Sequence, residues 1–187
     1  MIRPACQRSC LLLVIGFLIQ LSSYPQCRIN AQFGVPKDAE AEVGADGRVR
    51  LPDEVLAVAE SLVTVDTSMD QQDAVDIATI IDAAKKDANT KTMLAEMKAA
   101  NPKEFEATAG SEKVELVRGL LQAYEELKLL DTLFQDPERA LRLMVEEGMV
   151  EKEKIPMYEK NPQQLETDTR KGLYFMFVAL AEAAGYF

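Results

Sequence analysis

Apolar residues recur at helical spacing over most of the chain beyond Leu51, and no long stretch alternates apolar and polar residues with period two. The first predicted helix starts at Pro52, the second starts near Ser68 or Asp70, and a short third one ends before Asn101. Each has one apolar face, which needs a partner to cover it. These faces hold, in order, Val55, Val58, Leu62 and Val65; Ala74, Ile77, Ile81 and Ala84; and Met93, Leu94 and Met97.

The second half of the chain predicts three further helices. Ser111 is the expected N-cap of the longest one, which reaches about Phe134 and carries two apolar rows, so it should be buried on two sides. A shorter helix follows from Pro137, with Gly148 in the left-handed position after its end. The two rows are Val114, Val117, Leu121 and Tyr124, and Leu116, Leu120, Leu127 and Leu130, while the shorter helix turns Leu141, Met144 and Val145 inward.

The last predicted helix covers about 162–184, and its second half, Leu173 to Ala181, is apolar on every side. A helix that is apolar all round belongs in the centre of a core. The pattern therefore predicts an all-α protein, a compact bundle of about five to seven helices with this helix central. It predicts one helical domain over 51–187, because a chain of this length supports one core.

The first residues have the order of a signal peptide. Basic residues precede an unbroken apolar run from Leu11 to Ile19, which is too short to cross a bilayer as a helix, and polar residues follow it. Small-residue preference places cleavage after Ala31, so 1–31 is the predicted signal peptide. All three cysteines lie within it, and the remaining domain has no disulfides.

Residues 32–50 are rich in glycine and charge and predict a flexible acidic arm. The expected location is the secretory pathway or another extracytoplasmic compartment. The alternative is the stroma or thylakoid of an alga with a secondary plastid, because Phe33 directly after the cleavage position resembles such two-part targeting sequences. Against that alternative, the arm is acidic and lacks serine and threonine, whereas transit peptides are basic and serine-rich.

Composition excludes most catalytic chemistry. The chain has no histidine, and with the cysteines confined to the leader the domain lacks thiols, so imidazole, thiolate and most zinc or haem chemistry is absent. A calcium loop beginning at Asp66 fails because Gln71 stands where glycine is needed and Ile77 where glutamate is needed. The net charge of −10 disfavours nucleic acid. We therefore expect no enzyme, cofactor or metal.

Aromatic residues gather at the carboxyl end. Tyr174 and Phe177 lie on the apolar helix, and Tyr186 and Phe187 follow Gly185, which should stop that helix. Aromatic rings on such a helix are more often core than contact surface. These four residues are nevertheless the predicted partner-docking candidates, with Tyr186 and Phe187 as an exposed tip.

An Asx-Pro pair recurs three times and is typical of a helix start: Asn101-Pro102 before Phe105, Asp136-Pro137 before Leu141, and Asn161-Pro162 before Leu165. The Asx side chain can cap the first turn, and proline suits its first position. Short helices opened this way resemble the DP-type domains of Hsp-organising co-chaperones, over 101–180 at most. The resemblance implies a helical hand whose groove, between the Pro137 and Pro162 helices, holds an apolar client segment.

Three functions stay open from the sequence. The first is a non-catalytic exported interaction or assembly protein with a protein partner, no transmembrane helix in the mature chain, and peripheral membrane association left open. Acidic cofactor-free helical subunits of this size resemble peripheral proteins that stabilise photosynthetic or other membrane complexes. The second is a bundle that binds a lipid or pigment in a cavity lined by Leu173, Phe177 and Leu180. The third is the chaperone-like domain.

Overall fold

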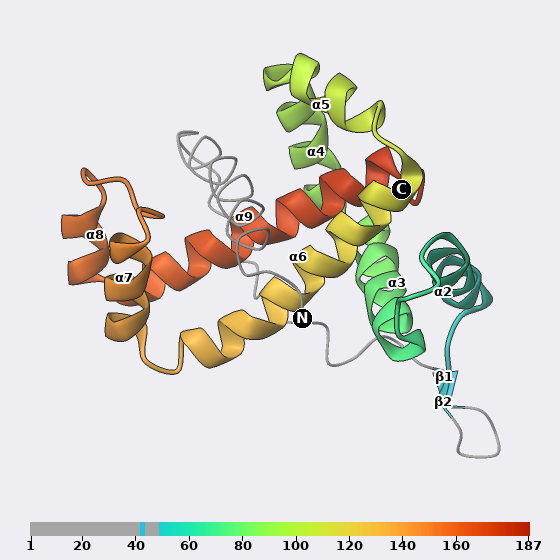
Figure 1. Cartoon of the computed structure of the whole chain (residues 1–187), viewed down its shortest axis with the longest axis horizontal. Coiled ribbons are helices and arrows are strands. Elements are labelled where there is room, and N and C mark those ends of the chain that lie inside the picture. The colour runs from blue at the N-terminus through green and yellow to red at the C-terminus, as the bar shows by residue number, and fades with distance from the viewer. Residues whose placement is uncertain (1–41, 44–48) are drawn as a thin grey trace. The chain divides into compact units, whose positions relative to one another are not determined.

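The computed structural model describes residues 42–43 and 49–187, and within them the chain is almost entirely helical (Figure 1). The predicted signal peptide and most of the predicted arm lie outside the described residues. The all-α class is confirmed. The elements are β1 (Glu42–Val43), β2 (Val49–Arg50), α2 (Asp53–Val65), α3 (Gln71–Lys86), α4 (Ala88–Ala100), α5 (Pro102–Ala109), α6 (Lys113–Leu133), α7 (Pro137–Glu146), α8 (Ile155–Lys160) and α9 (Pro162–Ala183).

The two strands are short and belong together. β1 and β2 pair antiparallel, with Glu42 opposite Arg50 and Val43 opposite Val49. The sequence pattern predicted no strand in this stretch. Two residues on each side are too few for a period of two to appear in a sequence pattern.

Helix α3 follows its predicted apolar stripe closely, and α2 follows its predicted stripe in part. All four predicted stripe residues of α3 are fully buried, and α2 buries Val55, Ala59 and Leu62. The carboxylate of Asp70 accepts a hydrogen bond from the Gln72 amide and caps α3. Among the described helices this pair packs most extensively. Local capping and one apolar stripe were therefore sufficient to predict α3, whereas on α2 the predicted Val58 and Val65 are half-buried and Ala59 is buried instead.

A single residue separates α3 from α4. Asp87 ends α3, and its carboxylate accepts hydrogen bonds from the amides of Asn89 and Thr90, so it also caps α4. The chain therefore turns sharply without a loop. The described residues form eight helices, more than the five to seven expected, because the short helices α5 (Pro102–Ala109) and α8 (Ile155–Lys160) were not marked by an apolar stripe.

The three Asx-Pro pairs each open a helix, α5, α7 and α9, with the proline at the first position. The Asp136 carboxylate accepts a capping hydrogen bond from the amide of Arg139 at 3.0 Å, whereas the side chain of Asn101 makes no capping bond within the described part of the chain. Proline placement, rather than the cap, is therefore the feature that these starts share.

The expected N-cap at Ser111 is wrong. The Ser111 hydroxyl points back to the carbonyl oxygen of Ala107 in α5, at 3.5 Å. Glu112 occupies the cap position of α6, and its carbonyl oxygen accepts from the amide of Leu116 at 3.2 Å. Sequence preference at caps is a local rule, and here the turn leaving α5 uses the serine instead.

The described helices belong to two compact units, and one of them combines segments that lie far apart in the sequence. One unit contains Glu126–Leu173, and the other contains the described residues before Glu126 together with Tyr174–Phe187. The dividing points fall inside α6 and α9, so each of these two long helices contributes residues to both units. We call them the 126–173 unit and the terminal unit.

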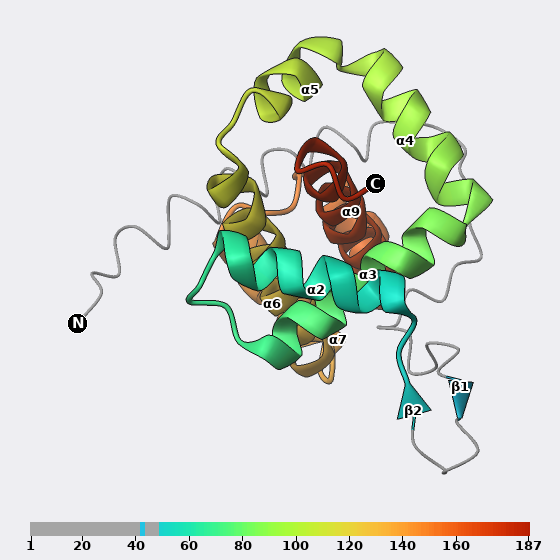
Figure 2. The same ribbon diagram turned by 90° about the vertical axis from the view of Figure 1, so that its right-hand side faces the viewer.

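In the terminal unit the carboxyl-terminal half of α9 is central, as predicted. Phe177, Val178 and Ala181 are fully buried. Thr90 of α4 contacts Tyr174 in this half of α9, and Ser61 of α2 and Lys113 of α6 contact Tyr186 just after it. Figure 2 shows α9 nearly end-on within this arrangement. A Cβ on Gly119 of α6 would lie 3.2 Å from Leu180, so glycine allows a close approach of the two helices.

The 126–173 unit is stabilised by backbone hydrogen bonds at a helix end and by side-chain hydrogen bonds and ion pairs between helices. Gly148 adopts φ 71 after α7, as predicted, and the amide of Met149 returns to the carbonyl oxygen of Met144 at 2.7 Å. The hydroxyl of buried Tyr158 in α8 donates to Asp168 of α9 at 3.0 Å. The guanidinium of Arg170 binds both Asp131 and Glu166. These ties connect α6, α8 and the first half of α9.

Candidate partner-docking site

The chain end does not project as a free tip but folds back on the terminal unit. After α9, Gly185 takes φ 79, and its amide donates to the carbonyl oxygen of Glu182 at 2.9 Å. The amide of Tyr186 donates to the carbonyl oxygen of Ala181 at 2.8 Å. This pair of bonds is a Schellman motif, which reverses the chain direction at a helix end. The turn brings Tyr186 back against the helix bundle.

Tyr186 is buried, with 6% of its surface exposed. Its hydroxyl lies 3.1 Å from the hydroxyl of Ser61 in α2, and the Lys113 ammonium lies 4.6 Å from the centre of its ring. A cation over a tyrosine face is attracted by the ring quadrupole. Tyr186 therefore connects the beginning of α6 and the middle of α2 to the end of α9.

Tyr174 forms a second polar connection. The Thr90 hydroxyl donates to Asp87 at 2.6 Å, so its oxygen is available to accept from the Tyr174 hydroxyl at 3.2 Å. The Thr90 hydroxyl, ahead of its amide, lowers the pKa of Asp87 despite an opposing effect of burial. Burial raises the pKa of Tyr174. These groups attach the α3–α4 corner to α9.

The structure places the four predicted docking residues in two classes. Phe177 is fully buried and Tyr186 is nearly so, which gives both rings a packing role in the terminal unit. Tyr174 and Phe187 are half-buried. Docking through any of these residues remains a prediction, but the burial of Tyr186 counts against a preformed exposed tip at that residue.

A salt bridge reinforces the same half of α9. The Lys98 ammonium of α4 pairs with one carboxylate oxygen of Glu182. The second oxygen is buried and has no hydrogen-bond partner within the described part of the chain. Because the Lys98 side chain is 45% exposed, solvent screens this pair, and its contribution to stability is small.

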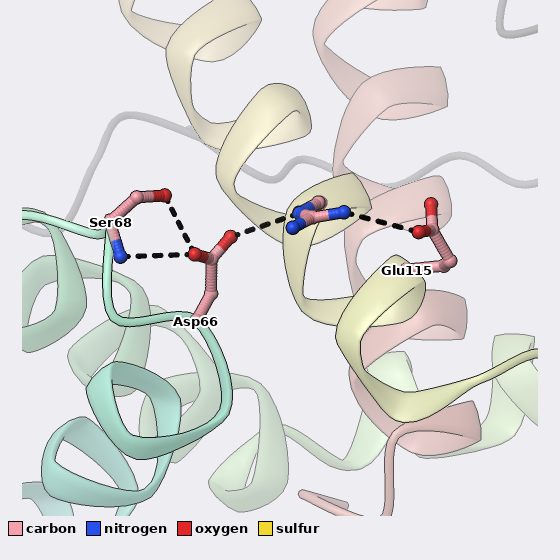
Figure 3. Close-up of polar contacts among 4 residues, drawn as sticks. Asp66, Ser68 and Glu115 are labelled. Atoms are coloured by element: carbon pink, nitrogen blue, oxygen red, sulfur yellow. Dashed lines mark hydrogen bonds and ion pairs between the residues drawn. The ribbon is translucent and has the colours of Figure 1, made fainter.

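Asp66 anchors a cluster that sequence patterns did not reveal (Figure 3). It follows α2, is only 6% exposed, and accepts from the Ser68 hydroxyl at 2.6 Å and the Ser68 amide at 3.1 Å. Its other oxygen accepts from Arg118 of α6 at 3.3 Å, and Arg118 also binds Glu115. The Ser68 hydroxyl, followed by the Ser68 amide and Arg118, lowers the pKa of Asp66 against an opposing effect of burial.

The residues of the rejected calcium loop thus have other roles. Asp66 binds Ser68 and Arg118, and Asp70 caps α3. Within the described residues no group of three or more acidic, histidine or cysteine side chains is placed to hold a metal ion. The acidic residues whose spacing suggested a cation site therefore form part of the connection between α2 and α3.

Two buried tyrosines of other elements also bind carboxylates. Tyr124 of α6 donates to Asp76 of α3 at 2.5 Å, and burial, followed by that bond, raises the pKa of Tyr124. Burial, followed by the charge of Asp168, raises the pKa of Tyr158. Burial disfavours the charge of Arg170, but its bonds to Asp131 and Glu166 outweigh this and raise its pKa. Tyr124, Tyr158 and Arg170 thus each link their own helix to another helix.

Several large apolar side chains face solvent, and the sequence pattern did not predict them. Leu129 is 65% exposed, Met157 44%, and Leu56 and Leu143 41% each. The three leucines lie outside the predicted apolar rows of their helices. Their positions in the sequence could have revealed them, because an apolar residue outside the buried stripe of its helix does not pack into the core beneath that helix.

No protein family, curated protein or solved structure matches this chain in the comparisons made. Among the described helices none combines the length and apolarity needed to cross a membrane. The function of this chain is therefore inferred from the side chains and surfaces described above.

Proposed function

We propose that this chain is a non-catalytic, exported interaction protein that acts as a peripheral subunit or stabilising factor of a larger assembly. One observation carries the proposal: of the four large apolar side chains that are exposed among the described residues, Leu129, Leu143 and Met157 belong to the 126–173 unit. A partner that covers these side chains removes their apolar surface from water, which favours association.

The polar groups support the same proposal. The groups with shifted pKa values each bind a neighbouring helix or turn, as Asp66 does with Arg118 and Tyr124 with Asp76. A catalytic group instead needs access to a substrate together with a suitably shifted pKa. In the described part of the chain these side chains serve packing and helix connection.

Site-specific photo-crosslinking tests the proposal. A photoreactive residue at Leu129, Leu143 or Met157 should give one defined adduct in native extract, because these side chains would be buried by the partner. The same residue at exposed Thr92 of α4 is the control and should give none. Mass spectrometry of the adduct also reports the amino terminus of the exported chain, which is expected near Gln32.

A Leu129→Ser variant provides the matching loss of function. Because Leu129 is 65% exposed, the folded state should keep its stability while the adduct at position 143 falls several-fold. The proposal fails if no position yields an adduct, or if the Thr92 control reacts equally. It also fails if Leu129→Ser leaves the yield unchanged.

A further inference from the structure

The α2–α3 pair carries an unusual run of charge. From Leu51 to Ala84 the sequence has eight aspartates and glutamates and no lysine or arginine. Helices α2 and α3 occupy most of this stretch and pack against each other (Figure 2). An excess of one sign on a packed helix pair produces a local potential that attracts the opposite charge.

Five of these eight acids interact with other groups of the fold. Asp66 pairs with Arg118, Asp70 caps α3 by accepting from the Gln72 amide, Asp76 accepts from Tyr124, Asp82 pairs with Lys86, and Asp73 also takes part in an interaction. On α2 the situation differs. Asp53, Glu54 and Glu60 are exposed, and no hydrogen bond or ion pair within the described residues engages their carboxylates.

Leu56 lies among these carboxylates. It is 41% exposed, while Val55, Ala59 and Leu62 form the buried face of the same helix. Asp53, Leu56 and Glu60 are spaced i, i+3 and i+7, which places them on one face of the helix. An exposed leucine is thus flanked by two carboxylates, one turn before it and one turn after it, which no described residue engages.

We propose that this face of α2 binds a basic amphipathic helix of a protein partner. An apolar side chain of the partner covers Leu56, and its lysines or arginines pair with Asp53, Glu54 and Glu60. Helices commonly bind through such spaced apolar anchors, with charge steering the encounter. The inference rests on the proposed function and names the class of partner. The same charge repels nucleic acid and anionic lipid.

The test uses the full chain and synthetic helical peptides. The probe is an 18-residue peptide of leucine and lysine with all leucines on one face; a scrambled peptide and one with glutamate for lysine are the controls. We expect only the amphipathic basic peptide to shift the amide resonances of α2. We expect binding to weaken about tenfold, or about 1.4 kcal/mol, in Leu56→Ser and in Glu60→Lys.

Matched variants separate this face from general charge and apolarity. Leu143→Ser removes an equally exposed leucine from the other unit, and Glu96→Lys reverses an exposed acid on α4. Neither should weaken peptide binding by more than about twofold. All four side chains are at least partly exposed, so circular dichroism should report an unchanged fold in every variant.

Several outcomes would overturn the inference: no binding of the basic peptide, equal binding of the scrambled peptide, or resonance shifts centred away from α2. Full binding by Leu56→Ser would also do so. Light scattering that shows a dimer in the wild type and a monomer in Leu56→Ser would assign the face to a second copy instead. The Leu129 crosslinks report on a different surface, so they can succeed when this inference fails.

Discussion

At the scale of single residues, two glycines decide how helices end. Gly148 and Gly185 have φ values of 71 and 79, a region that residues with a side chain rarely adopt. No atom lies within 4 Å of a Cβ built on either one. A substitution at these positions therefore changes the backbone preference and introduces no clash. The sequence revealed both, because glycine after an apolar helix is a local signal.

Gly185→Ala should lower the free energy of unfolding by about 1 kcal/mol, since alanine resists the left-handed conformation. Gly110→Ala is the control: Gly110 has φ −80, and a Cβ there would make ordinary contacts at 3.5 Å. It should be neutral or stabilising by up to about 1 kcal/mol. Urea denaturation followed by circular dichroism measures both. Equal losses in the two variants would contradict this account.

The lowered pKa of Asp66 makes its contribution dependent on pH. A carboxylate whose pKa is lower in the folded state stabilises the fold fully above its ordinary pKa of 3.8, and loses this effect as pH falls through the lowered value. Asp66→Asn should therefore be less stable than wild type at pH 7, and the difference should shrink below pH 3.8. Chemical denaturation at a series of pH values measures it.

Exposed Glu96 supplies the reference for that series, because Glu96→Gln removes a carboxylate from the surface of α4 without breaking a described contact. It should show little difference from wild type at either pH. A gap between Asp66→Asn and wild type that stays constant from neutral to acid pH would mean that Asp66 acts through packing alone.

At the scale of elements, local signals predicted helix starts and stripes well, and side-chain connections poorly. Proline positions, the Asp70 cap and the α3 stripe depend on residues close in sequence. The contacts of Tyr186 with Ser61 and of Arg118 with Asp66 join residues far apart in sequence. No periodic pattern marks such partners, since the sequence does not distinguish an arginine that only contacts solvent from one that pairs with a distant carboxylate.

The Tyr186 connection yields a graded prediction. Tyr186→Ala removes a buried ring that contacts α2 and α6, and should cost about 3 kcal/mol of unfolding free energy. Tyr186→Phe should cost about 1 kcal/mol, because only the bond to Ser61 is lost. Thermal and urea unfolding compare these variants with Phe187→Ala, which alters a half-buried side chain. A larger loss in Phe187→Ala than in Tyr186→Ala would contradict this ranking.

At the scale of the whole molecule, two compact units share the long helices α6 and α9. The exposed apolar residues fall in both units: Leu129, Leu143 and Met157 belong to the 126–173 unit, whereas Leu56 and the exposed α2 carboxylates belong to the terminal unit. The proposed function and the basic-helix inference therefore concern separate surfaces. Each can be disrupted by single substitutions at exposed positions.

The sequence by itself determined the helical class, the main apolar stripes and the absence of histidine and domain cysteine chemistry, because these depend on composition and on neighbours within a few turns. Only the tertiary structure decided that Tyr186 is buried, that Asp66 binds Arg118, and that Leu56 and Leu129 remain uncovered. Burial depends on which residues distant in the chain meet, and no local pattern carries that information.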